Sequence, residues 1–390
     1  TINGTTVQAI QLANANGPMG SATIDGNTIS NANTSLGADR GAIRLYGSGL
    51  SGTTTITNNT ISASHNAIAF KDGSNIAGKV INISGNTITV GTGSSVYHGG
   101  TGELDFTGAN SVNGIDVASA SLAGLYTVSG TISDGMDVAG KGLVRIKSAN
   151  LYAITGGNIG LGITAASTGD TVNVQAGTYT ENISISKRIT LDGAGSGAGG
   201  TALVSAAGAG TPVISVTGSG LDASNKLTIK DVSMVGTSNT SGSDGIAIYG
   251  DTPSAFVSVD NVNIANHGVG VHYRSGTISN VSVTNSTLSG NGFGVRVASA
   301  VTSMDGMTID GCTMNGNNSS AISTNPSGTT TNVNTNFVVS NSTFTGNGTA
   351  NLSDMHDLSF FGFHGNASLS NVTVTAGNGT AKYEIGRAHV

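Results

Sequence analysis

Apolar and polar residues alternate along most of this 390-residue chain in runs of only a few positions. Alternation with a period of two is typical of short, half-buried β-strands, and the 3.6-residue pattern of an amphipathic helix is nearly absent. One phrase recurs six times between Leu227 and Val374. Each copy has a β-favouring residue, a spacer, an Asn, Asp or Gly, a variable residue, a Ser, Thr or Asn, and an apolar residue.

The copies of this phrase start 24 to 30 residues apart, at Ile229, Val259, Val283, Ile309, Val339 and Leu369. A strand-turn-strand unit that returns at such an interval predicts a solenoid whose coils stack on one another. About three short strands with their turns fill one coil. We therefore predict an all-β fold, a parallel β-helix in which each strand pairs with its equivalent about 4.8 Å away.

The third residue of the phrase is predicted to lie at a sharp turn between two strands. Gly, Asn and Asp adopt a left-handed backbone most readily, and stacked Asn side chains can hydrogen-bond along a column. This structural turn ladder consists of Asp231, Asn261, Asn285, Asn341 and Asn371, with Gly311 in the remaining copy. It needs no ligand.

A related phrase occurs three times near the start of the chain, in Ile24–Ile29, Ile56–Ile61 and Ile83–Ile88. The residues that we assign to the same kind of ladder there are Asn27, Asn59 and Asn86. The phrase then disappears until about residue 164, and Tyr126–Val138 and Gly142–Lys147 predict irregular strands. We therefore predict two tandem arrays, over residues 1–112 and 160–383, joined by a connector over 113–159.

Composition supports a solenoid and excludes several classes of partner. The chain has 60 Gly but only 4 Pro, which suits tight turns between strands better than a collagenous or disordered chain. With 15 basic and 21 acidic residues it has no basic stripe, so we predict no nucleic-acid partner. No apolar run is long enough to span a bilayer, and we predict no membrane insertion within this segment.

Motifs after Gly160 resemble those of a known superfamily. They are Gly169-Asp-Thr-Val-Asn-Val174, Gly177-Thr-Tyr-Thr-Glu181 and Ile185-Ser-Lys-Arg-Ile-Thr-Leu-Asp-Gly-Ala-Gly195. The segment resembles the cap and first coils of right-handed parallel β-helix proteins of the pectin-lyase-like superfamily. The resemblance implies a right-handed solenoid with a cap, for which Ile159–Ser167 is the candidate because an uncovered end would expose strand edges.

Other segments bear on the origin of the chain. Lys141–Tyr152 is similar to joints between β-helix modules of very large bacterial surface proteins, which implies an extracellular or cell-surface location. The chain opens on Thr1 without an initiating Met or a signal peptide, so we expect an internal piece of a longer protein. Glu384–Val390 breaks the composition abruptly and resembles a translated sequencing adapter. We expect this tail to be non-native; the alternative is a genuine terminal strand.

The residues that polysaccharide-cleaving β-helix enzymes need are mostly missing. A pectate-lyase-like site requires several Asp carboxylates to hold Ca²⁺ beside an Arg or Lys base, and no dense acidic cluster occurs. Arg145-Ile-Lys147 echoes a polygalacturonase motif without the two upstream carboxyl groups that hydrolysis requires. We therefore predict no catalytic residues and no cofactor. If the protein is an enzyme, a polysaccharide lyase or a glycoside hydrolase is expected.

One set of side chains is a candidate for ligand binding: Tyr249, His272 and Arg296. Each lies in a strand that follows a copy of the phrase, and period-two geometry places the three outward in one line. Gly270 and Gly294 would leave a shallow floor beside them. Aromatic, imidazole and guanidinium groups can stack on and hydrogen-bond a sugar chain. The alternative is an ordinary solvated face, and in the first array Arg44, Tyr46 and Lys71 follow a similar pattern.

Three further candidates have a weaker basis. A metal site at His267 and His272 lacks carboxylate or thiolate partners at ligand spacing. A second polar group, formed by Asp354, His356, Asp357 and His364, more plausibly decorates a turn. Cys312 replaces a Val or Ser of the other copies, so we interpret it as a small packed residue.

We therefore predict a non-enzymatic structural or adhesive β-helical segment of a large bacterial extracellular surface protein. The alternative is a carbohydrate-binding or polysaccharide-cleaving module that uses the face of Tyr249, His272 and Arg296. The partner would be a polysaccharide or a host or cell-surface glycan. A third hypothesis is lateral association of copies through flat Thr- and Val-rich sides.

Overall fold

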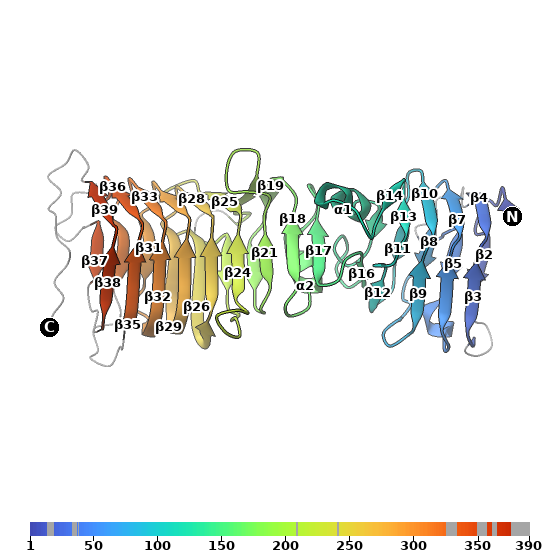
Figure 1. The fold of residues 1–390 in the computed structure, drawn as a ribbon, viewed down its shortest axis with the longest axis horizontal. Coiled ribbons are helices and arrows are strands. Elements are labelled where there is room, and N and C mark those ends of the chain that lie inside the picture. The colour runs from blue at the N-terminus through green and yellow to red at the C-terminus, as the bar shows by residue number, and fades with distance from the viewer. Residues whose placement is uncertain are drawn as a thin grey trace. The chain divides into compact units, whose positions relative to one another are not determined.

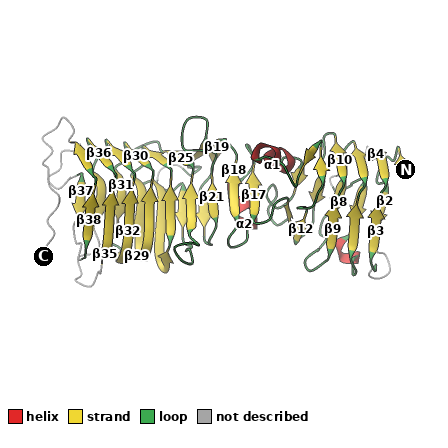
Figure 2. Cartoon of the chain, in the orientation of Figure 1, coloured by secondary structure: helices red, strands yellow, loops and turns green. Residues whose placement is uncertain are grey.

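The computed structural model describes residues 1–13, 19–32, 37, 39–207, 210–239, 242–324, 334–348, 357–360 and 365–375. They form two compact units, Thr1–Ala166 (unit 1) and Ser167–Val390 (unit 2). The strands make about 12 turns of parallel β-solenoid with 5% helix, which confirms the predicted fold class (Figures 1 and 2). The tail predicted over 384–390 lies outside the described residues.

The coils of unit 1 supply strands to three sheets, which are parallel except at one edge strand. The first sheet contains β3 (Ala22–Asp25), β6 (Thr54–Thr57) and β9 (Ile81–Ser84). The second contains β1 (Ile2–Asn3), β4 (Thr28–Ala32), β7 (Thr60–Ala63), β10 (Thr87–Val90), β13 (Ser111–Val112) and the edge strand β14 (Ile115–Asp116), which is antiparallel to β13. The third contains β2 (Ile10–Leu12), β5 (Ile43–Leu45), β8 (Ile68–Phe70), β11 (Val96–His98) and β15 (Ile132–Ser133). Equivalent strands of successive coils pair in register, as in Ile29 with Ile61 and Ile61 with Ile88, so the core is a set of stacked aliphatic columns.

The end of unit 1 departs from the regular coil. β12 (Glu103–Asp105) pairs with β16 (Leu143–Arg145), and β17 (Asn150–Ala153) follows. Elsewhere in unit 1, a short 3-10 helix, η1 (Gly47–Gly49), lies between β5 and β6. The helices are α1 (Leu122–Ser129) and α2 (Ile159–Ala165), red in Figure 2. The prediction of strands from Tyr126 onward was therefore wrong at its start. Ser121 caps α1 by accepting a hydrogen bond from the Gly124 amide, and Leu125 is buried, so capping and tertiary packing outweigh a weak helical pattern.

Unit 2 has three corresponding sheets. The first contains β18 (Thr171–Val174), β21 (Thr190–Asp192), β24 (Leu227–Lys230), β27 (Val257–Asp260), β35 (Asn334–Ser340) and β38 (Ala367–Ser370). The second contains β19 (Gly177–Thr180), β22 (Thr201–Val204), β25 (Val232–Val235), β28 (Asn263–Ala265), β30 (Thr287–Ser289), β33 (Thr313–Asn315), β36 (Thr343–Thr345) and β39 (Thr373–Thr375). The third contains β20 (Ile183–Ile185), β23 (Ile214–Val216), β31 (Phe293–Val297), β34 (Ser320–Thr324) and β37 (Leu358–Phe360). The long strands β26 (Asp244–Ala255), β29 (Val269–Thr284) and β32 (Val301–Asp310) join the first and third sheets.

The repeated phrase forms the turn between the first and second sheets. Its third residues in unit 2 have φ of 58°, 48°, 51°, 63°, 49° and 52° at Asp231, Asn261, Asn285, Gly311, Asn341 and Asn371. In unit 1 the left-handed residues are Gly26, Asn58 and Gly85, one position before Asn27, Asn59 and Asn86. Those three Asn side chains form a different column, directed toward the core. No helix in the described part of the chain is long and apolar enough to cross a membrane.

Candidate functional site

The third sheet of unit 2 brings His272 and Arg296 side by side. Residue pairing across β29 and β31 sets His272 opposite Arg296, one coil apart. The rest of this outer row has small side chains: Ser184, Ser215, Ala247, Ser323 and Ser359. His272 and Arg296 are therefore two large polar side chains in a row whose other members are small.

Tyr249 does not lie in this row. His272 pairs with Ala247, so Tyr249, two positions later in β26, lies beyond the row; it pairs with Ser275 because Arg274 is an extra residue in β29 at this point. Such a bulge displaces every following side chain by one position, and neither strand alone reveals it. The expected line of three side chains is thus reduced to His272 and Arg296. Gly270 and Gly294 also have another role: a Cβ on Gly270 would lie 2.6 Å from the Gly294 carbonyl oxygen, so close stacking of coils requires glycine there.

Asp244 organises the site, and the sequence analysis missed it. Asp244 is only 1% exposed, and one oxygen of its carboxylate accepts hydrogen bonds from His272 Nδ1 at 3.0 Å and Arg274 Nε at 2.7 Å. Burial alone would lower the pKa of Arg274, but the hydrogen bond and the charge of Asp244 raise it above its usual range. Asp244 begins β26, and its position on the chain carries no signal that β29 of the next coil will supply both partners.

His272 is held in one orientation by this contact. With Nδ1–H donating to Asp244, the neutral ring presents its lone pair at Nε2. Nε2 is buried and has no hydrogen-bond partner among the described residues. His272 is therefore a fixed, unsatisfied acceptor beside Arg296.

Arg296 is the half-buried cation of the group that is not paired with Asp244. Its guanidinium carbon lies 4.7 Å from the centroid of the Phe293 ring, a cation-π contact that holds the half-buried side chain against the sheet. Burial, together with the charge of Arg274, lowers the pKa of Arg296, although Asp244 opposes this effect. Within the described residues it makes no hydrogen bond or ion pair. Its guanidinium donors are thus available to an anion.

His267 lies in the turn before β29 and is 1% exposed. Both ring nitrogens lack partners among the residues described, and burial lowers the pKa of His267 to about 4. The described residues contain no group of three or more His, Cys, Asp or Glu side chains that could hold a metal ion. Of the second polar group, Asp354, His356 and His364 lie outside the described residues; Asp357 accepts a hydrogen bond from Asn347 Nδ2 at 2.9 Å.

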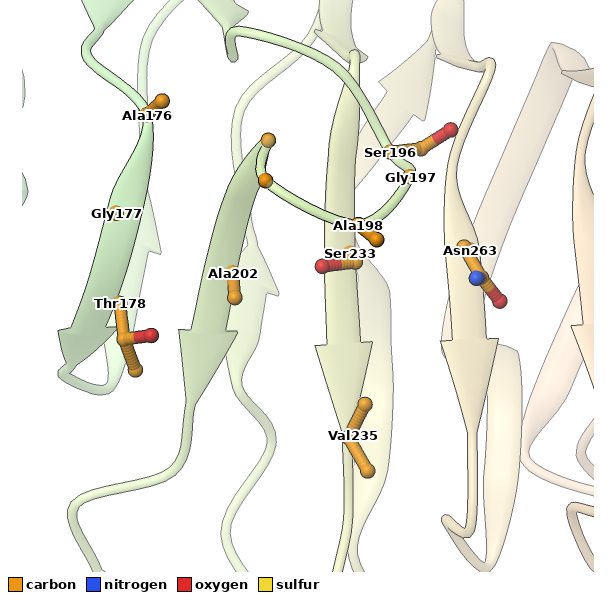
Figure 3. Close-up of a pocket in the computed structure, with 12 residues that line it drawn as sticks. Ala176, Gly177, Thr178, Ser196, Gly197, Ala198, Ala202, Ser233, Val235 and Asn263 are labelled. Carbon is orange, nitrogen blue, oxygen red and sulfur yellow. The ribbon is translucent and has the colours of Figure 1, made fainter.

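A hollow of about 460 Å³ lies on the second sheet of unit 2, under the loop that contains Ser196–Ala198 (Figure 3). Small side chains such as Thr178, Ala202, Ser233 and Asn263 line it. No charged or aromatic residue is among its lining residues, so it offers few directional contacts for a ligand. None of the predicted site residues lines this hollow.

Comparison with known proteins adds little to this geometry. No family model matches the chain, and no curated protein matches it. Among solved structures the chain is similar to the crystal structure of alginate lyase from Paenibacillus sp. str. FPU-7, with 22% identity and a TM-score of 0.45. The likeness covers 58% of this chain and 76% of that chain. The pectin-lyase-like superfamily therefore stays a prediction, and function must follow from the side chains themselves.

Proposed function

We propose that unit 2 is a polysaccharide-binding β-helix module whose ligand is an acidic glycan. Arg296 carries the proposal, because it is a cation placed on the outer face by Phe293 and left without an anionic partner among the described residues. A guanidinium forms two parallel hydrogen bonds with a carboxylate, the group that distinguishes a uronic acid from a neutral sugar. The low Ser and Ala row on either side leaves room for the flanking sugars.

The neighbouring groups favour an anion at this place. Asp244 is already shared by Arg274 and His272, so it balances only one of the two guanidinium charges. A carboxylate on the ligand would balance the other. Fixed, partly dehydrated donors bind such a group more strongly than mobile surface side chains do, because less ordering is required on binding.

A second candidate function is cleavage of the bound chain. The Asp244–His272 hydrogen bond favours it, because a carboxylate that orients an imidazole leaves Nε2 as a general base. In a β-elimination, this nitrogen would take the proton from the carbon next to the uronate carboxylate while Arg296 stabilises the developing charge. A C=C double bond would form as the glycosidic C–O bond breaks, and the leaving oxygen would take a proton from water. Nε2 is covered in the ligand-free protein, so binding is the primary proposal.

The adhesive role predicted from the sequence has no support from the comparisons and stays a prediction. Its location at a bacterial surface is likewise a proposal. Glycan binding is compatible with either a free or a surface-attached protein.

The test is binding of the full chain to polygalacturonate, alginate and neutral dextran by calorimetry. We expect binding to the two polyuronates only, and an Arg296→Gln variant to bind them roughly 10- to 100-fold more weakly, as expected for loss of a charge-assisted hydrogen bond. Arg188→Gln, an equal charge change elsewhere in unit 2, is the control and should bind normally. Equal affinity for Arg296→Gln and the parent protein would refute the proposal. Ultraviolet absorbance from an unsaturated product, lost in His272→Ala, would establish cleavage.

A further inference from the structure

The third sheet of unit 1 carries its own group of cations and aromatic rings. Arg44 and Tyr97 lie in one outer row, with Ala69 between them. Tyr46 and Lys71 directly follow β5 and β8, and the Lys71 amide continues the ladder by donating to the Leu45 carbonyl at 2.9 Å. The chain therefore places Tyr46 and Lys71 on adjacent coils, next to Arg44.

Arg44 and Lys71 both make cation-π contacts with the ring of Tyr46. The Arg44 guanidinium carbon lies 5.0 Å and the Lys71 ammonium 5.3 Å from the ring centroid. Contacts of this length restrain both cationic groups beside the aromatic ring. Arg44 is neutralised by Asp39, through Nη2 to Oδ2 at 2.5 Å. The Lys71 ammonium makes no hydrogen bond or ion pair within the described part of the chain.

On the neighbouring coil, Tyr97 is held in place by Asp72 and Lys141. Tyr97 donates its hydroxyl hydrogen to Asp72 at 2.7 Å and accepts from Lys141 Nζ at 2.9 Å, while the same ammonium lies 4.2 Å from the ring centroid. Burial, followed by the hydrogen bond to Asp72, raises the pKa of Tyr97 well above its usual range, so the phenol stays neutral. Asp72 is thus already occupied by Tyr97 and lies beside an unpaired Lys71.

We infer that the face formed by Tyr46, Lys71 and Arg44 is a second binding site for an acidic glycan, located in unit 1. Three cations lie on or beside this face, Arg44, Lys71 and Lys141. The two carboxylates nearby, Asp39 and Asp72, are already hydrogen-bonded to Arg44 and Tyr97, so the Lys71 ammonium is left without an anionic partner. A ligand carboxylate would bind Lys71, and a sugar ring would pack beside Tyr46. Unit 2 contributes no residue to this face, so the inference goes beyond the function proposed for unit 2 and does not depend on it.

The unit 1 face also differs from a general anion patch. Its cations are fixed against aromatic rings rather than spread along a solvated strand, which favours a ligand with both an anionic and a flat apolar part. A sugar acid has both, whereas inorganic phosphate or a sulfate ester group has only the charge. This difference makes the ligand class testable.

The experiment titrates the full chain with a short oligogalacturonate, too short to bridge two sites, and measures stoichiometry by calorimetry. We expect two ligands per chain. Lys71→Gln combined with Tyr46→Ala should leave one, and so should Arg296→Gln; all three changes together should abolish binding. Lys79→Gln removes an equal charge elsewhere in unit 1 and should leave two. Circular dichroism of each variant shows whether the fold is kept, and Lys71→Gln alone should weaken the unit 1 site about 10-fold if the double variant does not fold.

The outcomes separate this inference from the proposed function. One ligand per chain, lost in Arg296→Gln and unaffected by Lys71→Gln, would overturn the unit 1 site and keep the unit 2 site. One ligand lost only in Lys71→Gln would do the reverse. Equal binding of oligogalacturonate, dextran sulfate and inorganic phosphate at Lys71 would overturn the assignment to a sugar acid.

Discussion

Both units stabilise their coils with a column of buried polar side chains, but at different turns. In unit 1 the column lies between the first and second sheets and consists of Asn27, Asn59, Asn86 and Asn110. In unit 2 the equivalent positions hold Val, Ser or Cys, and the Asn column lies between the second and third sheets. That column consists of Asn291, Asn317 and Asn347 and ends on Asp357.

The unit 1 column is continuous. Asn86 is 1% exposed; its oxygen accepts from the amide and side chain of Asn59, and its Nδ2 donates to the Ile56 carbonyl and to Asn110. Asn59, Asn86 and Asn110 each thus satisfy backbone groups of a neighbouring coil. This arrangement fixes the register of stacking because a shift of one coil position would leave several donors unpaired.

The unit 2 column is interrupted where the candidate site begins. His267 occupies the place of an Asn. Its backbone amide donates to Asn291 Oδ1 at 3.0 Å and its carbonyl accepts from the Gly292 amide, but neither ring nitrogen has a partner among the described residues. The next residues along the chain form β29, which carries His272 and Arg274. The comparison shows that the Asn column lacks a member in the coil that supplies His272 and Arg274. Local departures of this kind are common where function competes with stability.

The largest expected change in stability comes from a substitution in the continuous Asn column of unit 1. Asn86→Ala should reduce the free energy of unfolding by about 3 to 5 kcal/mol, because several buried groups lose their partners at once. Chemical denaturation measures this difference. Asn82→Ala, an exposed Asn in β9, is the matched control and should change stability little. Equal effects of the two substitutions would show that the column is not stabilising.

His267 should make unit 2 sensitive to acid. Its folded pKa of about 4 lies below the ordinary 6.5, so between these values the unfolded chain binds a proton that the folded chain does not. Stability should therefore fall as the pH drops from about 6.5 to about 4, by up to about 3 kcal/mol, and should show no contribution from this group above pH 6.5 or so.

His267→Asn should extend the Asn column of unit 2 by one coil. The new Nδ2 should donate to the Met234 carbonyl, as Asn291 Nδ2 does to the Ile264 carbonyl one coil later. We expect about 1 kcal/mol of added stability at neutral pH and a larger advantage at pH 5, since the titrating group is gone. Thermal unfolding at both pH values measures it; a variant with the parent pH profile would contradict the assignment.

The smallest expected change in stability concerns a surface contact found in both units, in which an Asp carboxylate accepts hydrogen bonds from the next coil. Asp25 accepts from Thr57 and Asn58, and Asp310 accepts from Ser340 and Asn341 on the next coil. The hydrogen bond from Ser340, then that from Asn341, lowers the pKa of Asp310 below its ordinary value. Its stabilising contribution is therefore present above pH 4 or so and is lost as the pH falls through the lowered value.

Asp310→Ala should consequently lower the melting temperature slightly at neutral pH and not at all at pH 2. Asp251→Ala is the control, because this exposed carboxylate has no such contact with the described residues. A decrease that persists unchanged at pH 2 would show that charge at Asp310 has no part in it.

The repeat was sufficient to predict the solenoid, since alternation and a fixed interval are local properties of the chain. Consecutive strands such as β24 and β25, and the turn between them, follow directly from the phrase at Ile229–Met234. The helix α1 could not be predicted this way, because its stability comes from a cap and from burial against the coils. His272 and Arg296 were placed correctly side by side by their shared period, and Tyr249 was not, because the register between β26 and β29 pairs His272 with Ala247, two positions before Tyr249.

The amino-acid sequence by itself determined the coil, its turns and the polar, weakly charged outer surface, because each depends on residues close together in the chain. Only the tertiary structure decided which polar groups meet. Asp244 and His272 are 28 residues apart and touch because their coils are neighbours, and Tyr97 meets Lys141 at a separation of 44. Contacts of this kind depend on the length of each coil and on single bulges, which pattern alone does not encode.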